Sequence, residues 1–168
     1  MLDWGGGIGY DHLLTAALVP SVHTEWCCVD LPIMCAVGQR RQPDVTFVAD
    51  DVSWCDRRYD LVLCSISLQY VEHWELLAKR LARAADPWLY VSRLPVVEHS
   101  ASFVAVQRAH KYGYDAQYLG WVFNRGQLRQ VFAACGLDLV REFFLHDRPL
   151  IWRAPEDNVY SGFLFHAR

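Results

Sequence analysis

The ten residues that decide the fold read MLDWGGGIGY and occupy positions 1–10. An acidic residue is followed by glycines at alternate positions, in the pattern Asp3-x-Gly5-x-Gly7-x-Gly9. A glycine has no Cβ, so its backbone can adopt positive φ and can approach a ligand closely. Residues 11–19 have a helical pattern, and the free N–H groups of a helix N-terminus would face such a loop. This stretch therefore predicts a strand, a glycine-rich turn and a helix that together hold a nucleotide-like ligand.

The spacing of the glycines separates this loop from two other nucleotide-binding loops. The dinucleotide fingerprint G-x-G-x-x-G would need a glycine at Tyr10 or His12, and the P-loop would need a lysine, whereas the first lysine is Lys79. The pattern resembles motif I of the class I S-adenosylmethionine-dependent methyltransferases. This resemblance implies S-adenosylmethionine as cofactor, bound by Asp3 and by the three alternate glycines. The alternative is a glycine-rich turn that serves structure alone.

Composition limits the class of protein and its partners. A chain of 168 residues suits one domain, and 53% apolar with 21% charged residues is typical of a globular protein. The net charge of −3 argues against a nucleic-acid partner. Because no apolar run has the length of a membrane span and no signal peptide is recognisable, we expect a cytoplasmic protein with no membrane partner. The six cysteines form no C-x-x-C pair, so we expect buried thiols and no metal site.

Strands and helices alternate along most of the chain, which predicts a parallel sheet covered on both faces. The last two expected strands, 137–144 and 159–166, follow one another without a helix and predict an antiparallel hairpin at the sheet edge. Between the fifth strand and this hairpin, Asn124 and Gln127 predict the capped start of a helix that stops at Gly136. With the resemblance, the expected fold is the Rossmann-like seven-stranded methyltransferase sheet of order 3-2-1-4-5-7-6, with the last strand antiparallel.

Two acidic positions follow the second and third expected strands. Asp30 lies about twenty residues past the glycine loop, where such folds place a carboxylate on the ribose hydroxyls, and Leu31 beside it is grouped with the cofactor site. The alternative role for Asp30 is to cap the helix that begins after it, before Leu31. After the third strand, the resemblance implies that Asp51 accepts from the adenine amino group and that the amide of Val52 meets a ring nitrogen. Paired acids such as Asp50 and Asp51 also occur as solvated turn residues.

The fourth expected strand, 59–65, and the segment 66–71 after it resemble the fourth motif of the same family. The carboxyl end of this strand would lie beside the methyl donor. The resemblance therefore implies Cys64, Ser65 and Gln69 as wall residues of the cofactor site. Taken alone, the run needs no function, since an apolar strand in a parallel sheet is buried on both faces.

Residues 96–121 show no clear sheet character and are rich in aromatic and polar side chains. In open α/β sheets the crevice lies outside the carboxyl ends of the strands, and this segment leaves one of them. We therefore expect it to be a substrate lid within a single domain of residues 1–168. Tyr112 and Tyr118 are its candidate substrate contacts.

A methyl acceptor that reacts through a hydroxyl group would need a base, and histidine suits that role. His99 and His110 on the expected lid are the candidate catalytic residues, and His73 is third; a lone histidine is more often a surface residue. Arg93, at the end of the fifth strand, is the candidate contact for an anionic substrate. Its alternative is a salt bridge beside the sheet.

At finer grain, the chain resembles a methyltransferase group associated with bacterial surface-polysaccharide gene clusters. Four segments carry this resemblance: Leu2-Asp3-Trp4-Gly5-Gly6, Ser67-Leu68-Gln69-Tyr70, Arg93-Leu94-Pro95 and Trp121-Val122-Phe123-Asn124-Arg125. This resemblance implies a small-molecule or saccharide acceptor, methylated by in-line displacement, and it leaves a homodimer open.

The chain departs from the family at its start, because only Met1 and Leu2 precede Asp3 in the first strand. We therefore expect a truncated first strand and a domain that lacks N-terminal residues. A second hypothesis is accordingly a non-catalytic methyltransferase-fold binding protein. A nicotinamide oxidoreductase is the third, and the glycine spacing disfavours it.

Overall fold

The computed structural model describes residues 1–49, 52–108, 113, 115–145 and 150–168. In chain order the elements are β1 (Leu2–Trp4), α1 (Tyr10–Leu18), β2 (Cys27–Val29), α2 (Pro32–Arg41), β3 (Thr46–Val48), the 3₁₀ helix η1 (Ser53–Asp56), β4 (Tyr59–Ser65), the 3₁₀ helix η2 (Leu68–Tyr70), α3 (Trp74–Ala84), β5 (Ala85–Val97), β6 (Phe103–Arg108), β7 (Gln117–Asn124), α4 (Arg125–Ala134), β8 (Leu137–Leu145) and β9 (Val159–Ala167). The alternation of strands and helices expected from the sequence is therefore present as far as α3 and β5.

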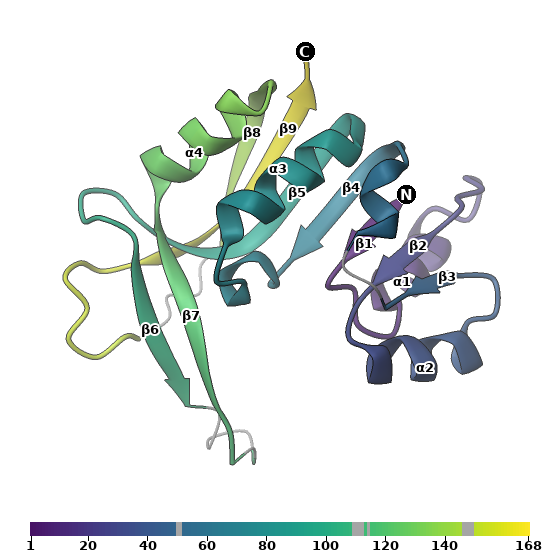
Figure 1. The fold of residues 1–168 in the computed structure, drawn as a ribbon, viewed down its shortest axis with the longest axis horizontal. Coiled ribbons are helices and arrows are strands. Elements are labelled where there is room, and N and C mark those ends of the chain that lie inside the picture. The colour runs from purple at the N-terminus through teal and green to yellow at the C-terminus, as the bar shows by residue number, and fades with distance from the viewer. Residues whose placement is uncertain (50–51, 109–112, 114, 146–149) are drawn as a thin grey trace.

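The strands form one twisted sheet (Figure 1). Strands β3, β2, β1, β4 and β5 are parallel neighbours in that order. Strand β9 pairs with β5 in the antiparallel sense, and β8 pairs with β9. When the hairpin of β6 and β7 is set aside, this is the expected order 3-2-1-4-5-7-6 with the last strand antiparallel. The first strand is short, as expected: β1 pairs with β4 only through Leu2 and Asp3.

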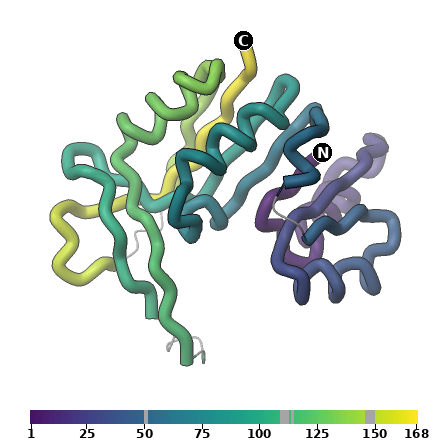
Figure 2. The backbone as a smooth tube through the Cα atoms, viewed as in Figure 1, coloured from purple at the N-terminus to yellow at the C-terminus, as the bar shows by residue number. Residues whose placement is uncertain are grey.

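The segment between β5 and α4 differs from the expectation. Residues 96–121 were expected to lack sheet character, yet β6 and β7 form an antiparallel hairpin, and β7 extends the sheet by pairing with Val96 and Val97 at the end of β5. The hairpin projects away from the body of the domain (Figure 2). Because little of it packs on the core, most of β6 is exposed and shows no alternation of apolar and polar residues. The expectation was wrong for this physical reason.

Apolar side chains of α3, α4 and the central strands form the core. Trp74 at the start of α3 meets Phe123 of β7 at a ring-centroid distance of 5.0 Å, and Phe132 of α4 meets Phe165 of β9 at 4.7 Å. The helix α4 begins as expected, with the Asn124 side chain accepting a hydrogen bond from the backbone N–H of Gln127 at 2.9 Å. The core thus fixes the carboxyl ends of β4 and β5 beside β7, where the candidate site lies.

Candidate functional site

The loop between β1 and α1 is built on glycines with left-handed backbone. Gly5, Gly7 and Gly9 have φ values of 74°, 63° and 84°. The left-handed backbone conformation is strained for residues that carry a Cβ. Each of the alternate glycines of the motif is therefore required by the backbone conformation at its position. The loop is tied to the neighbouring strand by the Gly5 backbone N–H, which donates to the carbonyl oxygen of Val29 at 2.7 Å.

The glycines differ in the space around them. A Cβ on Gly5 would overlap the Ser67 hydroxyl. A Cβ on Gly7 would meet only the Met34 methyl group, at 3.6 Å. Gly5 therefore permits close packing between the loop and the segment after β4, whereas Gly7 faces open space that a ligand can occupy.

Asp30 connects this loop to the start of α2. One carboxylate oxygen accepts a hydrogen bond from the Gly7 backbone N–H at 2.7 Å, and the other accepts from the N–H of Leu31, also at 2.7 Å. Leu31, not Asp30, is the N-cap residue of α2, and its side chain is exposed. A carboxylate has about four acceptor positions, so Asp30 retains acceptor capacity beside the loop.

Asp3 lies directly under the loop and is buried. Its side chain is 1% exposed, and its Oδ2 atom has no hydrogen-bond partner among the described residues. Burial, together with the negative charges of Asp11 and Asp30, raises the pKa of Asp3 from 3.8 to about 7. An unpartnered buried carboxylate in a group of acids favours a bound cation.

The segment after β4 lies between the glycine loop and the hairpin. The Ser67 hydroxyl donates to the carbonyl oxygen of Ser65 at 2.9 Å and lies 3.3 Å from that of Gly5. Ser65 also accepts a hydrogen bond from the Ser92 hydroxyl at 3.0 Å. Gln69 in η2 is 5% exposed, and its Oε1 atom has no partner among the described residues. Ser65 thus lies near the loop through its bond with Ser67, and Gln69 follows two residues later.

Cys64 has a different environment from its neighbours. Its side chain is completely buried within the apolar core, and burial raises the pKa of its thiol well above the ordinary value. Successive side chains of a strand point to opposite faces, so the thiol lies on the core side while Ser65 does not. The charge of Asp3 contributes to this rise in pKa, and the assignment of Cys64 to the wall of the cofactor site stays a prediction.

A groove of about 1090 Å³ begins at η2 and continues along the hairpin. Gln69 and Tyr70 line one part of it, β6 and β7 contribute a second, and the loop of residues 150–155 contributes a third. The Tyr70 hydroxyl donates to Gln107 Oε1 at 2.8 Å, and the Tyr70 ring makes an edge contact with Tyr118 at a centroid distance of 6.4 Å. Gln69 thus lines the groove two residues after Ser67, which contacts the glycine loop at Gly5.

Comparison with known proteins identifies the family. The family model described as a methyltransferase domain matches residues 1–142. The chain belongs to this family. Its members take S-adenosylmethionine as methyl donor, so the expected enzyme class and cofactor are confirmed. No curated protein sequence matches the chain.

Solved structures of low sequence identity share the fold. Magnesium protoporphyrin IX methyltransferase from Synechocystis, with bound S-adenosylmethionine, is 18% identical over 99% of this chain and 69% of that one, with a TM-score of 0.66. The N-terminal domain of EvdMO1, with bound S-adenosylhomocysteine, is 16% identical over 99% and 74%, with a TM-score of 0.68. A pericyclic reaction enzyme is 14% identical over 99% and 42%, with a TM-score of 0.63. At these identities the likeness concerns the fold alone.

The residues of the methyltransferase domain fit its cofactor. S-adenosylmethionine carries a positive charge on its sulfonium sulfur and another on its amino group, and the buried carboxylate of Asp3 has no cationic partner among the described residues. The open space over Gly7 and the accepting carboxylate of Asp30 suit the polar groups of the same molecule. Val52 is half exposed and precedes η1, whereas Asp51 lies outside the described residues.

The residues expected to bind or activate the acceptor are less well placed. His99 is exposed, and the groove lining does not include it. Arg93 is exposed at an irregularity of β5, has a φ of 56°, and makes no ion pair with a described residue. His110 and Tyr112 lie outside the described residues. The groove lining thus includes neither Arg93 nor His99, which lies in the turn after the end of β5 at Val97.

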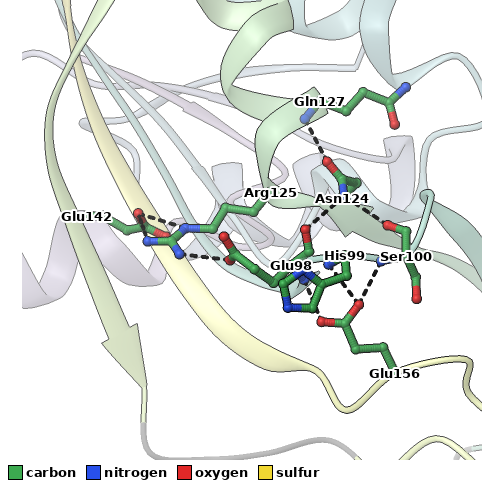
Figure 3. Close-up of polar contacts among 8 residues, drawn as sticks. All are labelled: Glu98, His99, Ser100, Asn124, Arg125, Gln127, Glu142 and Glu156. Atoms are coloured by element: carbon green, nitrogen blue, oxygen red, sulfur yellow. Dashed lines mark hydrogen bonds and ion pairs between the residues drawn. The ribbon is translucent and has the colours of Figure 1, made fainter.

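A network of polar contacts holds that turn (Figure 3). The carboxylate of Glu156 accepts hydrogen bonds from the backbone N–H groups of Glu98, His99 and Ser100 at 2.9, 2.9 and 2.7 Å. These bonds lower the pKa of Glu156 to about 2. Arg125 adds ion pairs to Glu98 at 2.9 Å and to Glu142 at 2.7 Å. Since Glu156 directly follows residues 150–155, the network fixes one wall of the groove.

Sequence reasoning missed Tyr70, Gln107 and the loop of residues 150–155. Tyr70 stands in a motif that the sequence analysis quoted, but its bond to Gln107 joins residues 37 positions apart. The apolar run Leu150-Ile151-Trp152 within an otherwise polar connection was the available signal for the loop.

Over the described parts of the chain, no group of three or more histidine, cysteine or acidic residues could hold a metal ion. No helix within those same parts is long and apolar enough to cross a membrane.

Proposed function

We propose that this domain transfers the methyl group of S-adenosylmethionine to a small-molecule or sugar-type acceptor bound in the groove beside Gln69. The observation that carries the proposal is the buried carboxylate of Asp3, whose Oδ2 atom has no partner among the described residues, beneath a glycine loop with open space over Gly7. When bound, the donor supplies an electrophilic methyl group on a sulfonium sulfur.

In this proposal the cofactor site consists of residues from four segments. Asp3 faces the positive charge of the donor, and the backbone at Gly5, Gly7 and Gly9 accommodates its amino-acid part. Asp30, with Leu31 beside it, accepts from the ribose hydroxyls, and the segment of Asp51 and Val52 meets the adenine. Ser65 and Gln69 complete the side nearest the acceptor.

Catalysis depends mainly on alignment. Methyl transfer is an in-line displacement, and positioning of the two reactants supplies much of its rate. Among the described residues that line the groove, none is a histidine, a lysine or a carboxylic acid. Burial raises the pKa of Tyr70, so Tyr70 is protonated near neutral pH and donates a hydrogen bond instead of accepting a proton. In the proposal Gln69, which lines the groove, lies on the side of the acceptor's nucleophilic group.

The sugar-type acceptor and the link to surface polysaccharides remain part of the proposal. They rest on the four quoted sequence segments, one of which contains Gln69 and another Trp121, and both of these residues line the groove. A donor-binding protein without transfer activity is the second candidate. The lack of a base among the described lining residues favours it.

Calorimetry with S-adenosylmethionine and with NADH tests the donor, followed by transfer of a labelled methyl group to a panel of hydroxylated sugars and phenols. We expect binding of S-adenosylmethionine, no binding of NADH, and transfer to at least one acceptor, which Gln69→Leu should slow. Absence of S-adenosylmethionine binding would overturn the proposal. Donor binding without transfer to any member of the panel would support the second candidate instead.

A further inference from the structure

Among the described residues that line the groove, two are arginines and none is acidic. Arg108 ends β6, and Arg153 lies in the loop of residues 150–155. Neither makes an ion pair with a described residue. Both side chains are exposed and therefore available to a ligand. Guanidinium groups bind carboxylates and phosphates through paired hydrogen bonds, so these two residues give the groove a preference for anions.

Arg153 is held in place and not merely exposed. Its backbone has a φ of 59°, a conformation that costs free energy for a residue with a Cβ. Its guanidinium carbon lies 4.2 Å from the ring centroid of Trp152, in a cation–π contact. Three residues later, Glu156 binds the backbone N–H groups of the Glu98–Ser100 turn. The loop that presents Arg153 is therefore anchored close to that residue, which lowers the entropy lost when a ligand binds.

Aromatic side chains elsewhere in the groove lining suit a ligand that contains a ring. The side chains of Tyr70, Trp121 and Trp152 are among the lining residues and offer aromatic surface. Aromatic faces bind flat or apolar ring faces, while the arginines bind charge.

We infer that the acceptor is a ring-bearing molecule with a carboxylate or phosphate group, and that Arg153 and Arg108 bind this group. The inference rests on the proposed function, since it takes the groove as the acceptor site. It replaces Arg93, which does not line the groove, as the contact for an anion.

The test uses ligand-observed NMR and calorimetry on the full chain saturated with S-adenosylhomocysteine. The probes are phenyl phosphate, benzoate and the neutral benzyl alcohol. We expect at least one anion to bind tenfold or more tightly than benzyl alcohol, and to weaken as ionic strength rises. The tighter-binding anion of phenyl phosphate and benzoate identifies which anionic group, phosphate or carboxylate, the groove binds.

Arg153→Gln and Arg108→Gln should each weaken the anion at least fivefold and leave benzyl alcohol unchanged. Arg129→Gln is the matched control, because Arg129 is an exposed arginine of α4 outside the groove. Equal affinities for the anions and benzyl alcohol, or anion affinities unchanged in both groove variants, would overturn the inference. Binding of S-adenosylhomocysteine, measured first in each protein, separates this failure from failure of the proposed function.

Discussion

Replacement of Asp3 by asparagine should change how the stability of the domain depends on pH. The side chain is 1% exposed, and its pKa rises from 3.8 to about 7 because of burial and of the charges of Asp11 and Asp30. A carboxyl group with a raised pKa binds its proton more tightly in the folded state. Its ionisation therefore destabilises the fold as pH rises from about 4 to about 7, and the full cost is present above that range.

The magnitude follows from the pKa values. One pKa unit corresponds to about 1.4 kcal/mol, so the rise from 3.8 to about 7 corresponds to about 4 kcal/mol at alkaline pH. About half of this, or roughly 2 kcal/mol, develops between about pH 5.5 and about pH 8. Asparagine cannot ionise, so Asp3→Asn should lack this loss of stability. Any fixed cost of the new amide group is the same at both pH values and cancels in the difference.

Urea unfolding of the wild type and of Asp3→Asn at these two pH values, without donor, measures the effect. The free energy of unfolding of the wild type should fall by roughly 2 kcal/mol more than that of the variant. Asp44→Asn, at an exposed position, is the control and should follow the wild type. Parallel pH dependence in the wild type and Asp3→Asn would refute the reasoning, because it would mean that Asp3 has a partner or reaches water.

Three further predictions concern the loop, the ribose contact and the groove wall. Gly7→Val should abolish binding of S-adenosylmethionine in calorimetry, because its side chain would fill the open space over the loop and the φ of 63° would be strained; normal affinity would show that the donor does not lie across Gly7. Asp30→Ala should weaken donor binding by roughly 1.5–3 kcal/mol, the scale of charge-assisted hydrogen bonds, and an unchanged affinity would remove Asp30 from the site. Glu156→Ala should speed hydrogen exchange of the three amides of the Glu98–Ser100 turn without changing donor affinity, since their common acceptor is lost; unchanged protection of these amides would show that the turn holds without Glu156.

Local pattern determined the order of elements and several of their ends. Pro32 begins α2, Asn124 caps α4, and Gly136 with a φ of 85° follows the end of α4, as the sequence indicated. Each of these signals acts within one turn of chain, so it can be read without knowledge of the rest of the fold. The alternation of strands and helices likewise restricted the topology, because the crossover connections between parallel strands are right-handed. Asp3 and the glycines could be identified as a candidate donor site because their spacing is local.

The composition of the groove depends on contacts between distant segments, and only the tertiary structure decided it. The hairpin of β6 and β7 was missed because it is exposed on much of its surface and carries no simple alternation. Burial of Cys64 beside the accessible Ser65 follows from which face of β4 the helices cover. Arg153 reaches the groove because Glu156 ties its loop to a turn more than fifty residues earlier in the chain. No pattern within either segment records this pairing, because the bonds that hold it go to backbone N–H groups, which every residue except proline possesses.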